Sequence, residues 1–348
     1  MTSAPPTGHR SVHLVGTVPA DNARAAFELF AAEVGDHLPV WVPDGETGDR
    51  QDWIQRIIEA LRQHPDLHLA RDGDWSDYEH TPYFAVAPGR EFTTLDLDYS
   101  THFNESWPSF LAFRSEHGGD RVLQVGIPSH IDLALSAFGF RPGPALRNMA
   151  PFRDATVREI TKIHSVAGDD AVFQLEIPIP LILLTRVPAV MRPFVAGRLA
   201  SELVKVVRRS PAGTRFGIHL CYGDMNHKSM GDPDDSLPMV QLANAIAAAW
   251  PAAQRLEFVH APFARGEEPP SLDPGFYAPL ARLRLPPGVR FAAGLVHERL
   301  SLDEMKDLRD RLEALIGTTV DVGASCGLGR RDRSRAEANL RLSAEVAS

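Results

Sequence analysis

Residues 215–226 read R-F-G-I-H-L-C-Y-G-D-M-N, and this stretch carries the pattern that decides the fold. Its first half, Arg215–His219, is a short run that is rich in β-forming residues, which predicts a buried strand. Small and polar residues follow it, and an amphipathic segment, Pro238–Ala248, comes next along the chain. A strand that leads into a helix in this way is typical of a parallel β–α unit.

The same unit recurs along the chain. Apolar runs that end in small or polar clusters also occur at Val12–Gly16, Pro39–Val42, Val122–Gly126, Ala171–Leu175, Leu256–His260, Val289–Leu295 and Thr319–Gly323. Helical patterns between the runs include Ala23–Val34, Trp53–Arg62, Pro193–Arg208 and Asp303–Ile316. The last of these has a capping box that begins at Ser301 and the expected stop at Gly317. Eight such units predict an α/β fold of the (β/α)8 TIM barrel type, as a single domain over residues 1–348.

One segment departs from this rhythm. Residues 63–119 are rich in aromatic side chains and irregular in pattern. We therefore expect an insertion between the second and third strands that caps the barrel or forms an interface. Its aromatic residues are more often explained by core packing than by stacking on a ligand.

Composition excludes several classes of protein. The formal net charge of -9 argues against nucleic-acid and anionic-membrane partners, which are bound by clustered Lys and Arg. The two cysteines cannot form a disulfide framework, and residues 1–11 lack the apolar core of a signal peptide, so a cytoplasmic protein is predicted. No apolar run is long enough to span a bilayer. The sequence leaves a homodimer open.

In a barrel of this type the chemistry lies at the carboxyl ends of the strands. His219 and Cys221 are two positions apart, so they project from the same face, about 7 Å apart along the chain, and can reach one metal ion. Cys326 lies in S-C-G-L-G-R-R at the end of the eighth predicted strand. Taken alone, the pattern is a moderate signal for a metal site, because free cysteines are more often packed as small apolar residues.

Other strand ends carry further candidates. His260 is offered as a fourth ligand or a general base, and His297 as a group that transfers a proton, with Arg299 beside it to hold a substrate charge. Hydrogen-bonded packing is the alternative for each histidine. Glu46 and Glu176 would be carboxylates in an enclosed mouth, where they need a cation such as a substrate ammonium group. A solvated turn is the alternative for Glu46.

Several strand ends together resemble the catalytic C-terminal barrel of cobalamin-independent methionine synthase. H-L-C-Y-G-D-M-N at 219–226 is similar to the family's H-x-C-Y-x-x-F-N, and S-C-G-L-G-R-R at 325–331 to its D-C-G-L-K-T-R. V-G-T-V-P at 15–19 is similar to V-G-S-F-P, D-G-E at 44–46 to H-G-E, and Q-L-E-I-P at 174–178 to Q-I-D-E-P. The motifs also occur in the same order.

The resemblance implies a site. It puts His219, Cys221 and Cys326 on zinc-ligand positions, and Glu46, Glu176 and Thr17 in the pocket for the amino-acid part of homocysteine. The family's remaining ligand is a Glu at the end of the sixth strand, where the register here offers His260. The folate-side tryptophan motif after T-G-P-V-T has no counterpart in G-I-P-S-H-I-D-L-A-L at 126–135, nor does the N-terminal half of the long synthases. The resemblance therefore does not extend to methyltetrahydrofolate as the donor.

On this basis we expect an enzyme that depends on zinc, activates a substrate thiol and transfers a methyl or other alkyl group to its sulfur. Its partners would be a small-molecule thiol and a methyl or alkyl donor. Asp224, Asn226 and His297 are candidates to orient the electrophile or to handle a proton. A thiolate that opens an epoxide, as in the similar epoxyalkane:coenzyme M transferase, belongs to the same zinc class.

Two alternatives remain at this point. A metal-independent lyase like uroporphyrinogen decarboxylase would act on a carboxylated substrate, with carboxylate contacts from Arg265, Arg299 and Arg330. A barrel that binds a metal without catalysis would serve as a carrier or partner protein.

Overall fold

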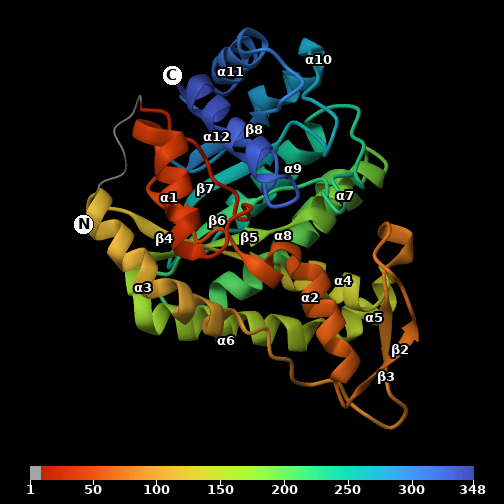
Figure 1. Ribbon diagram of the computed structural model, residues 1–348. Helices are drawn as coiled ribbons and strands as arrows, with labels where there is room; N and C mark the ends of the chain where they lie inside the picture. Colours follow the sequence, from red (N-terminus) through yellow and green to blue (C-terminus); the bar gives the residue numbers. More distant parts are fainter. Residues whose placement is uncertain (1–8) are drawn as a thin grey trace.

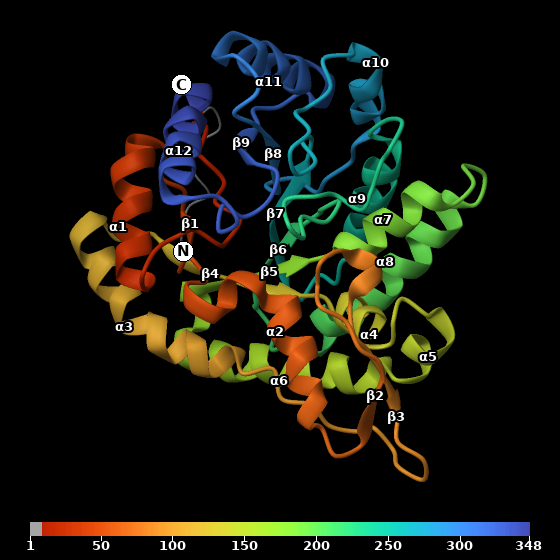
Figure 2. The same cartoon turned by 45° about the vertical axis from the view of Figure 1, so that its right-hand side comes forward.

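A computed structural model describes residues 9–348, and within them seven parallel strands form one curled sheet (Figure 2). The strands follow one another across the sheet in the order β1-β4-β5-β6-β7-β8-β9. Their bounds are Trp41–Pro43, Val122–Pro128, Ala171–Glu176, Arg215–His219, Arg255–Pro262, Arg290–Val296 and Asp321–Ala324, respectively. Because each strand pairs in parallel with the next, all their carboxyl ends meet at one rim.

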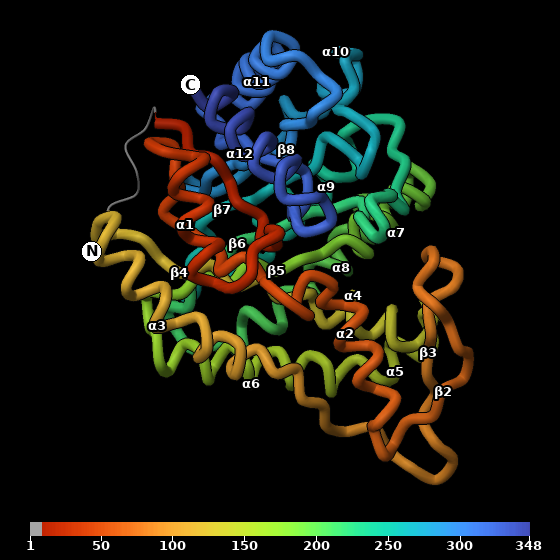
Figure 3. Tube along the Cα trace, in the orientation of Figure 1, coloured from red at the N-terminus to blue at the C-terminus, as the bar shows by residue number. Residues whose placement is uncertain are grey.

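Helices surround the outer face of the sheet (Figure 1). They are α1 Ala23–Val34, α2 Trp53–Ala60, α3 Tyr99–His117, α4 His130–Ala137, α5 Pro142–Arg147, α6 Met149–Ala167, α7 Pro178–Arg186, α8 Arg192–Arg209, α9 Leu237–Ala249, α10 Pro274–Tyr277, α11 Leu302–Ile316 and α12 Arg333–Ala347. Short 3-10 turns occur at Gly35–His37, Gly48–Asp52, Leu61–Gln63, Tyr78–His80, Gly168–Asp170 and Ala278–Arg282. The first helix, α1, packs against the last, α12, so the two ends of the described chain lie together (Figure 3).

Most predicted elements are confirmed within one or two residues. The helix Ala23–Val34 and the strand Arg215–His219 have the predicted bounds. The capping box of α11 is present, since the Ser301 side chain accepts from the Glu304 amide and the Glu304 side chain accepts from the Ser301 amide. Gly317 ends that helix in the left-handed conformation, with φ 81°.

Val12–Gly16 does not form the eighth strand that the sequence predicts. Only Val12 makes a parallel bridge, to Val322 of β9. The carbonyl groups of Leu14 and Val15 instead accept hydrogen bonds from the buried side-chain amides of Gln124 on β4 and Gln174 on β5. The described residues therefore show a curled seven-stranded sheet, and a closed eight-stranded barrel stays a prediction.

Residues 63–119 are only partly irregular, which corrects the prediction. They contain a two-stranded antiparallel hairpin, β2 Leu67–Arg71 and β3 Tyr83–Val86, that projects beside α2 (Figure 1). They also contain the 19-residue helix α3, which packs against α1 and α6. Its buried residues have helical spacing, but Trp107 and Leu111 lie outside that buried face and Pro108 lies inside the helix. These residues weaken the hydrophobic periodicity and hid the helix from the sequence pattern.

The interior of the curled sheet has two layers below the strand ends. Trp41, Val122, Val172 and Phe258 form a small apolar cluster at the bottom. Above it lies a buried polar layer in which Gln124 donates to Gln174 and the ring of His13 stacks on the ring of His260. Among the described residues, this packed interior fills the floor below the rim at the carboxyl ends.

Among the described residues, no helix combines the length and the apolar character that crossing a bilayer requires. The sequence predicts no signal peptide in residues 1–11, and this stretch falls mostly outside the described residues, because residues 1–8 are not among them. A cytoplasmic location and a homodimer therefore stay predictions from the sequence.

Candidate metal centre and active site

Three neighbouring strands place residues at or near their carboxyl ends in one row. In the register of the sheet, Glu176 on β5 pairs with His219 on β6, and His219 pairs with His260 on β7. The chain continues from His219 to Cys221, while β9 leads into the turn that carries Cys326. The two sulfurs lie 3.8 Å apart, and the ligand atoms of His219, Cys221 and Cys326 all lie within 4.8 Å of one another. Tertiary structure thus brings together the three residues that the sequence singled out.

His260 lies next to this group but not in it. Its ring stacks on the ring of His219 with centroids 4.8 Å apart, and the Nδ1 atoms of the two rings are 2.7 Å apart. Nε2 of His260 lies 3.1 Å from the carbonyl oxygen of Ala324, which can only accept, so this nitrogen carries the proton. Nδ1 of His260 is then the acceptor, and Nδ1 of His219 the donor. This tautomer leaves Nε2 of His219 with a free lone pair for a metal.

The two thiols share their protons unequally. The hydrogen bond from Cys221 to Cys326 lowers the pKa of Cys326 well below its ordinary value, and His219 and Arg330 lower it further. The same hydrogen bond, together with burial, raises the pKa of Cys221. The pair therefore favours a single thiolate, on Cys326, and a bound cation would favour a second one.

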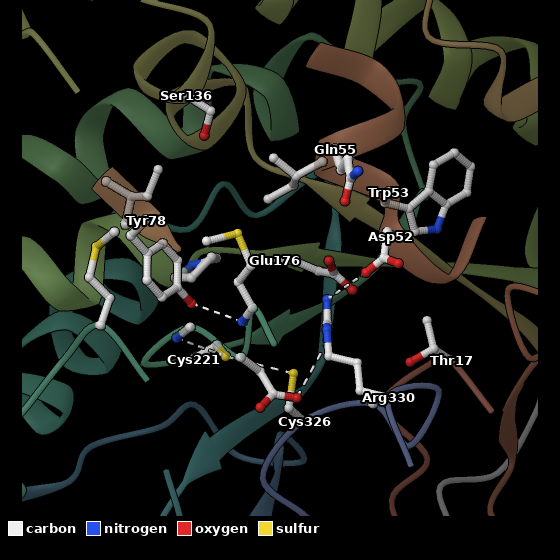
Figure 4. Close-up of a pocket in the computed structure, with 18 of the residues that line it drawn as sticks. Thr17, Asp52, Trp53, Gln55, Tyr78, Ser136, Glu176, Cys221, Cys326 and Arg330 are labelled. Atoms are coloured by element: carbon white, nitrogen blue, oxygen red, sulfur yellow. Dashed lines mark hydrogen bonds and ion pairs between the residues drawn. The ribbon is translucent and has the colours of Figure 1, made fainter. Parts of the chain in front are cut away.

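A cavity with a volume of about 170 Å³ opens above these sulfurs (Figure 4). Its lining includes Thr17, Glu46, Glu176, Asp224 and the three candidate ligands. Residues from strand ends far apart in the sequence thus face one space, as expected for the rim of a sheet whose strands are all parallel.

Glu46 and Glu176 form a buried pair of carboxyl groups. Each places Oε1 within 3.0 Å of the point that a Cβ at Gly126 would occupy, so only glycine leaves room for both. Burial, and then the charge of Glu176, raises the pKa of Glu46 well above its ordinary value, and burial also raises the pKa of Glu176. Glu46 Oε1 is buried and has no hydrogen-bond partner among the described residues. A cation bound here would satisfy that oxygen and relieve the repulsion.

Arg330 points into the cavity between Asp52, Glu176 and Cys326 (Figure 4). Its contacts to Asp224 Oδ2 and Asp52 Oδ1 are loose, at 3.4 and 3.5 Å. Burial and the charge of Cys326 raise the pKa of Asp224. The guanidinium is thus the positive charge nearest to a cluster of sulfurs and carboxyl groups.

The other predicted residues lie outside the lining of the cavity. The side chain of Asn226 donates to the carbonyl groups of Trp75 and Ser76, and therefore holds a loop in place. His297 is buried, with Nε2 3.2 Å from the carbonyl oxygen of Gly266. Arg299 is exposed, and its guanidinium donates to the Glu267 carbonyl. Arg265 pairs with Asp232 and Glu268, as a surface arginine does.

The structure also adds lining residues that the sequence did not single out. Trp75 and Tyr78 reach the cavity from the loop between β2 and β3, and Asp52 and Gln55 from the start of α2. The prediction that residues 63–119 cap the barrel was the only signal for the first two. Nothing in the local sequence distinguishes Asp52 or Gln55 from other exposed helix-start residues.

Comparison with known proteins identifies the fold. No family model matches the sequence, and no curated protein matches it. Among solved structures, a B12-independent methionine synthase from Shewanella sp. W3-18-1 in complex with selenomethionine is similar, with 11% identity, a TM-score of 0.63 and coverage of 98% of this chain and 97% of that chain. A methyltransferase from Methanosarcina mazei is similar with 13% identity, a TM-score of 0.50 and coverage of 98% and 94%. The predicted resemblance is confirmed at the level of the fold, which this chain shares over almost its full length with a B12-independent methionine synthase.

Proposed function

We propose that this chain is a zinc-dependent transferase that moves a methyl or other alkyl group to the sulfur of a small-molecule thiol. The observation that supports it most is the convergence of His219, Cys221 and Cys326 at the base of one cavity. The names of the two similar structures, a methionine synthase and a methyltransferase, support alkyl transfer as the reaction class.

The donor set fits zinc. Two thiol sulfurs and one imidazole nitrogen are typical zinc ligands, and a site with three protein ligands keeps a fourth position for a substrate. His219 and Cys221 are 3% and 5% exposed, so water competes little for the site. When bound, zinc would lower the pKa of a substrate thiol and supply a thiolate at neutral pH.

The carboxyl pair would hold the acceptor. An ammonium group between Glu46 and Glu176 would offset the burial that raises the pKa of both carboxyl groups, and would also relieve the repulsion by Glu176 that raises the pKa of Glu46 further. Thr17 lines the same cavity and would contact the rest of the acceptor. The similar Shewanella protein was solved with selenomethionine, a methylated amino acid, which makes an amino-acid thiol such as homocysteine the first acceptor to test.

The chain's own residues would handle the charges of the transfer. The acceptor sulfur attacks the alkyl carbon, a carbon–sulfur bond forms, and the bond from that carbon to the donor's leaving atom breaks. The electron pair stays on the leaving atom, which then takes up a proton. Asp224 lines the cavity and would hold that proton, since burial raises its pKa. Arg330 would balance the negative charge of the sulfurs.

Metal analysis of the freshly purified full chain tests this proposal. We expect stoichiometric zinc in the parent protein and its loss in Cys221→Ser and in Cys326→Ser. His297→Ala removes a strand-end histidine that does not line the cavity and should retain the metal. A parent protein that lacks stoichiometric zinc overturns the proposal.

Turnover separates the transferase from its alternatives. Transfer predicts that a chelator and Cys326→Ser each abolish the joint consumption of thiol and alkyl donor. A lyase predicts turnover of a carboxylated substrate that neither change affects. Of the three arginines expected to bind carboxylates, only Arg330 lines the cavity, so the structure supports the lyase less. A metal carrier predicts zinc without turnover of any thiol and donor.

A further inference from the structure

One part of the cavity lining is an apolar wall. It consists of Trp75, Tyr78, Ile179, Ile182, Met225 and Met230, from the β2–β3 loop, α7 and the loop after β6. In Figure 4, Tyr78 lies across the view from Thr17 and Asp52. Four of these side chains are only half-buried although they are apolar or aromatic, so protein does not cover the side that faces the cavity.

Hydrogen bonds within the protein hold this wall in place and use up its polar atoms. The Tyr78 hydroxyl accepts from the Met225 amide at 2.9 Å and donates to the Lys228 carbonyl at 3.2 Å. The Trp75 indole N–H donates to Glu59 on α2 at 2.7 Å. Because the hydroxyl and the indole N–H are both occupied, the rings offer a ligand only their apolar surfaces.

The wall also lacks cations. Among the lining residues of the described chain, Arg330 is the only Lys or Arg, and it faces Asp224 and Asp52. A donor that carries carboxylate or phosphate groups against the wall would bury them without a partner, which costs free energy. The wall therefore selects an uncharged group.

We propose that this apolar wall binds the electrophile of the transfer, and that the electrophile presents an uncharged aromatic ring to it. The role of the ligand rests on the proposed function, whereas its chemical class rests on the wall alone. Aromatic side chains stack on flat rings, and the flexible thioethers of Met225 and Met230 can adapt to a ring edge.

Calorimetric titration of the full chain with anisole and with 4-methoxybenzoate tests the proposal. The two probes share a methoxy-substituted ring and differ in one carboxylate. We expect anisole to bind and 4-methoxybenzoate to bind at least about tenfold more weakly, a difference of about 1.4 kcal/mol, because the wall offers the carboxylate no partner. Equal or tighter binding of the benzoate, or no heat from anisole, overturns the proposal.

Variants locate the binding. Met230→Lys adds a cation to the wall, so it should weaken anisole and strengthen 4-methoxybenzoate, a reversal that misfolding cannot produce. Leu69→Ala on the same hairpin lies outside the cavity lining and should change neither. Cys221→Ser should keep anisole binding, so failure of the zinc site and failure of this inference give different results. If Met230→Lys leaves both affinities unchanged, the ring binds elsewhere and the proposal is wrong.

Discussion

Replacement of His260 by phenylalanine should weaken zinc binding without removing a ligand. The Nδ1 atom of His260 accepts the proton of His219 Nδ1 across 2.7 Å, and this contact selects the His219 tautomer that presents Nε2 to a metal. His260→Phe keeps a ring between those of His13 and His219, where His260 now stacks, but removes the acceptor. Loss of a hydrogen-bond partner behind a metal-binding histidine typically costs about 10- to 100-fold in metal affinity, which corresponds to about 1.4–2.7 kcal/mol.

Competition with a chromophoric zinc chelator measures this affinity directly. His260→Asn should retain most of it, because an Asn side-chain carbonyl can accept the same proton. His297→Ala serves as the control, since His297 lies away from the cavity lining. Zinc affinity of His260→Phe within about threefold of the parent protein, well below the expected loss, would refute the tautomer argument. So would an equal loss in the two His260 variants.

Three further predictions concern pH, packing and substrate. Burial raises the pKa of Asp132 on α4 to about 7, above its unfolded value. The stabilisation that the buried, protonated carboxyl group contributes is therefore full below about pH 3.9 and is lost as the pH rises through about 7. Urea unfolding should show a free energy of unfolding that falls by up to about 1.4 kcal/mol per pH unit in that window, and by less in Asp132→Asn. Arg290→Met removes the ion-pair partner of the Asp321 carboxylate, which is 4% exposed, and should lower the free energy of unfolding by about 3–5 kcal/mol in the same assay. A loss below about 1 kcal/mol, which is the range of surface ion pairs, would contradict this prediction. Gly126→Ala would place a methyl group 2.4 Å from Glu46 Oε1 and displace that carboxyl group, so KM for an amine-bearing thiol should rise about tenfold or more while KM for 2-mercaptoethanol stays unchanged.

Local patterns predicted most of the scaffold. The run Arg215–His219 and the helix Ala23–Val34 have the predicted bounds. A strand that is buried on both faces leaves a short continuous run, and a helix that is buried on one face leaves a periodic pattern, so both signals are local. The same reasoning failed for Val12–Gly16, whose backbone bonds to side chains that are more than 100 positions away. It also failed for α3, where apolar side chains such as Leu111 lie outside the buried stripe and blur the periodic signal.

The candidate site, like the scaffold, was predicted only in part. The sequence by itself determined which residue types stand at the strand ends, and so it predicted that His219, Cys221 and Cys326 share one site. Only the tertiary structure decided that His260 faces His219 and a carbonyl group, and that Trp75 and Tyr78 wall the cavity. Residue type and strand position are local properties of a chain, whereas the partner of a ring nitrogen or the neighbour of a cavity depends on contacts between segments that meet only when the sheet curls.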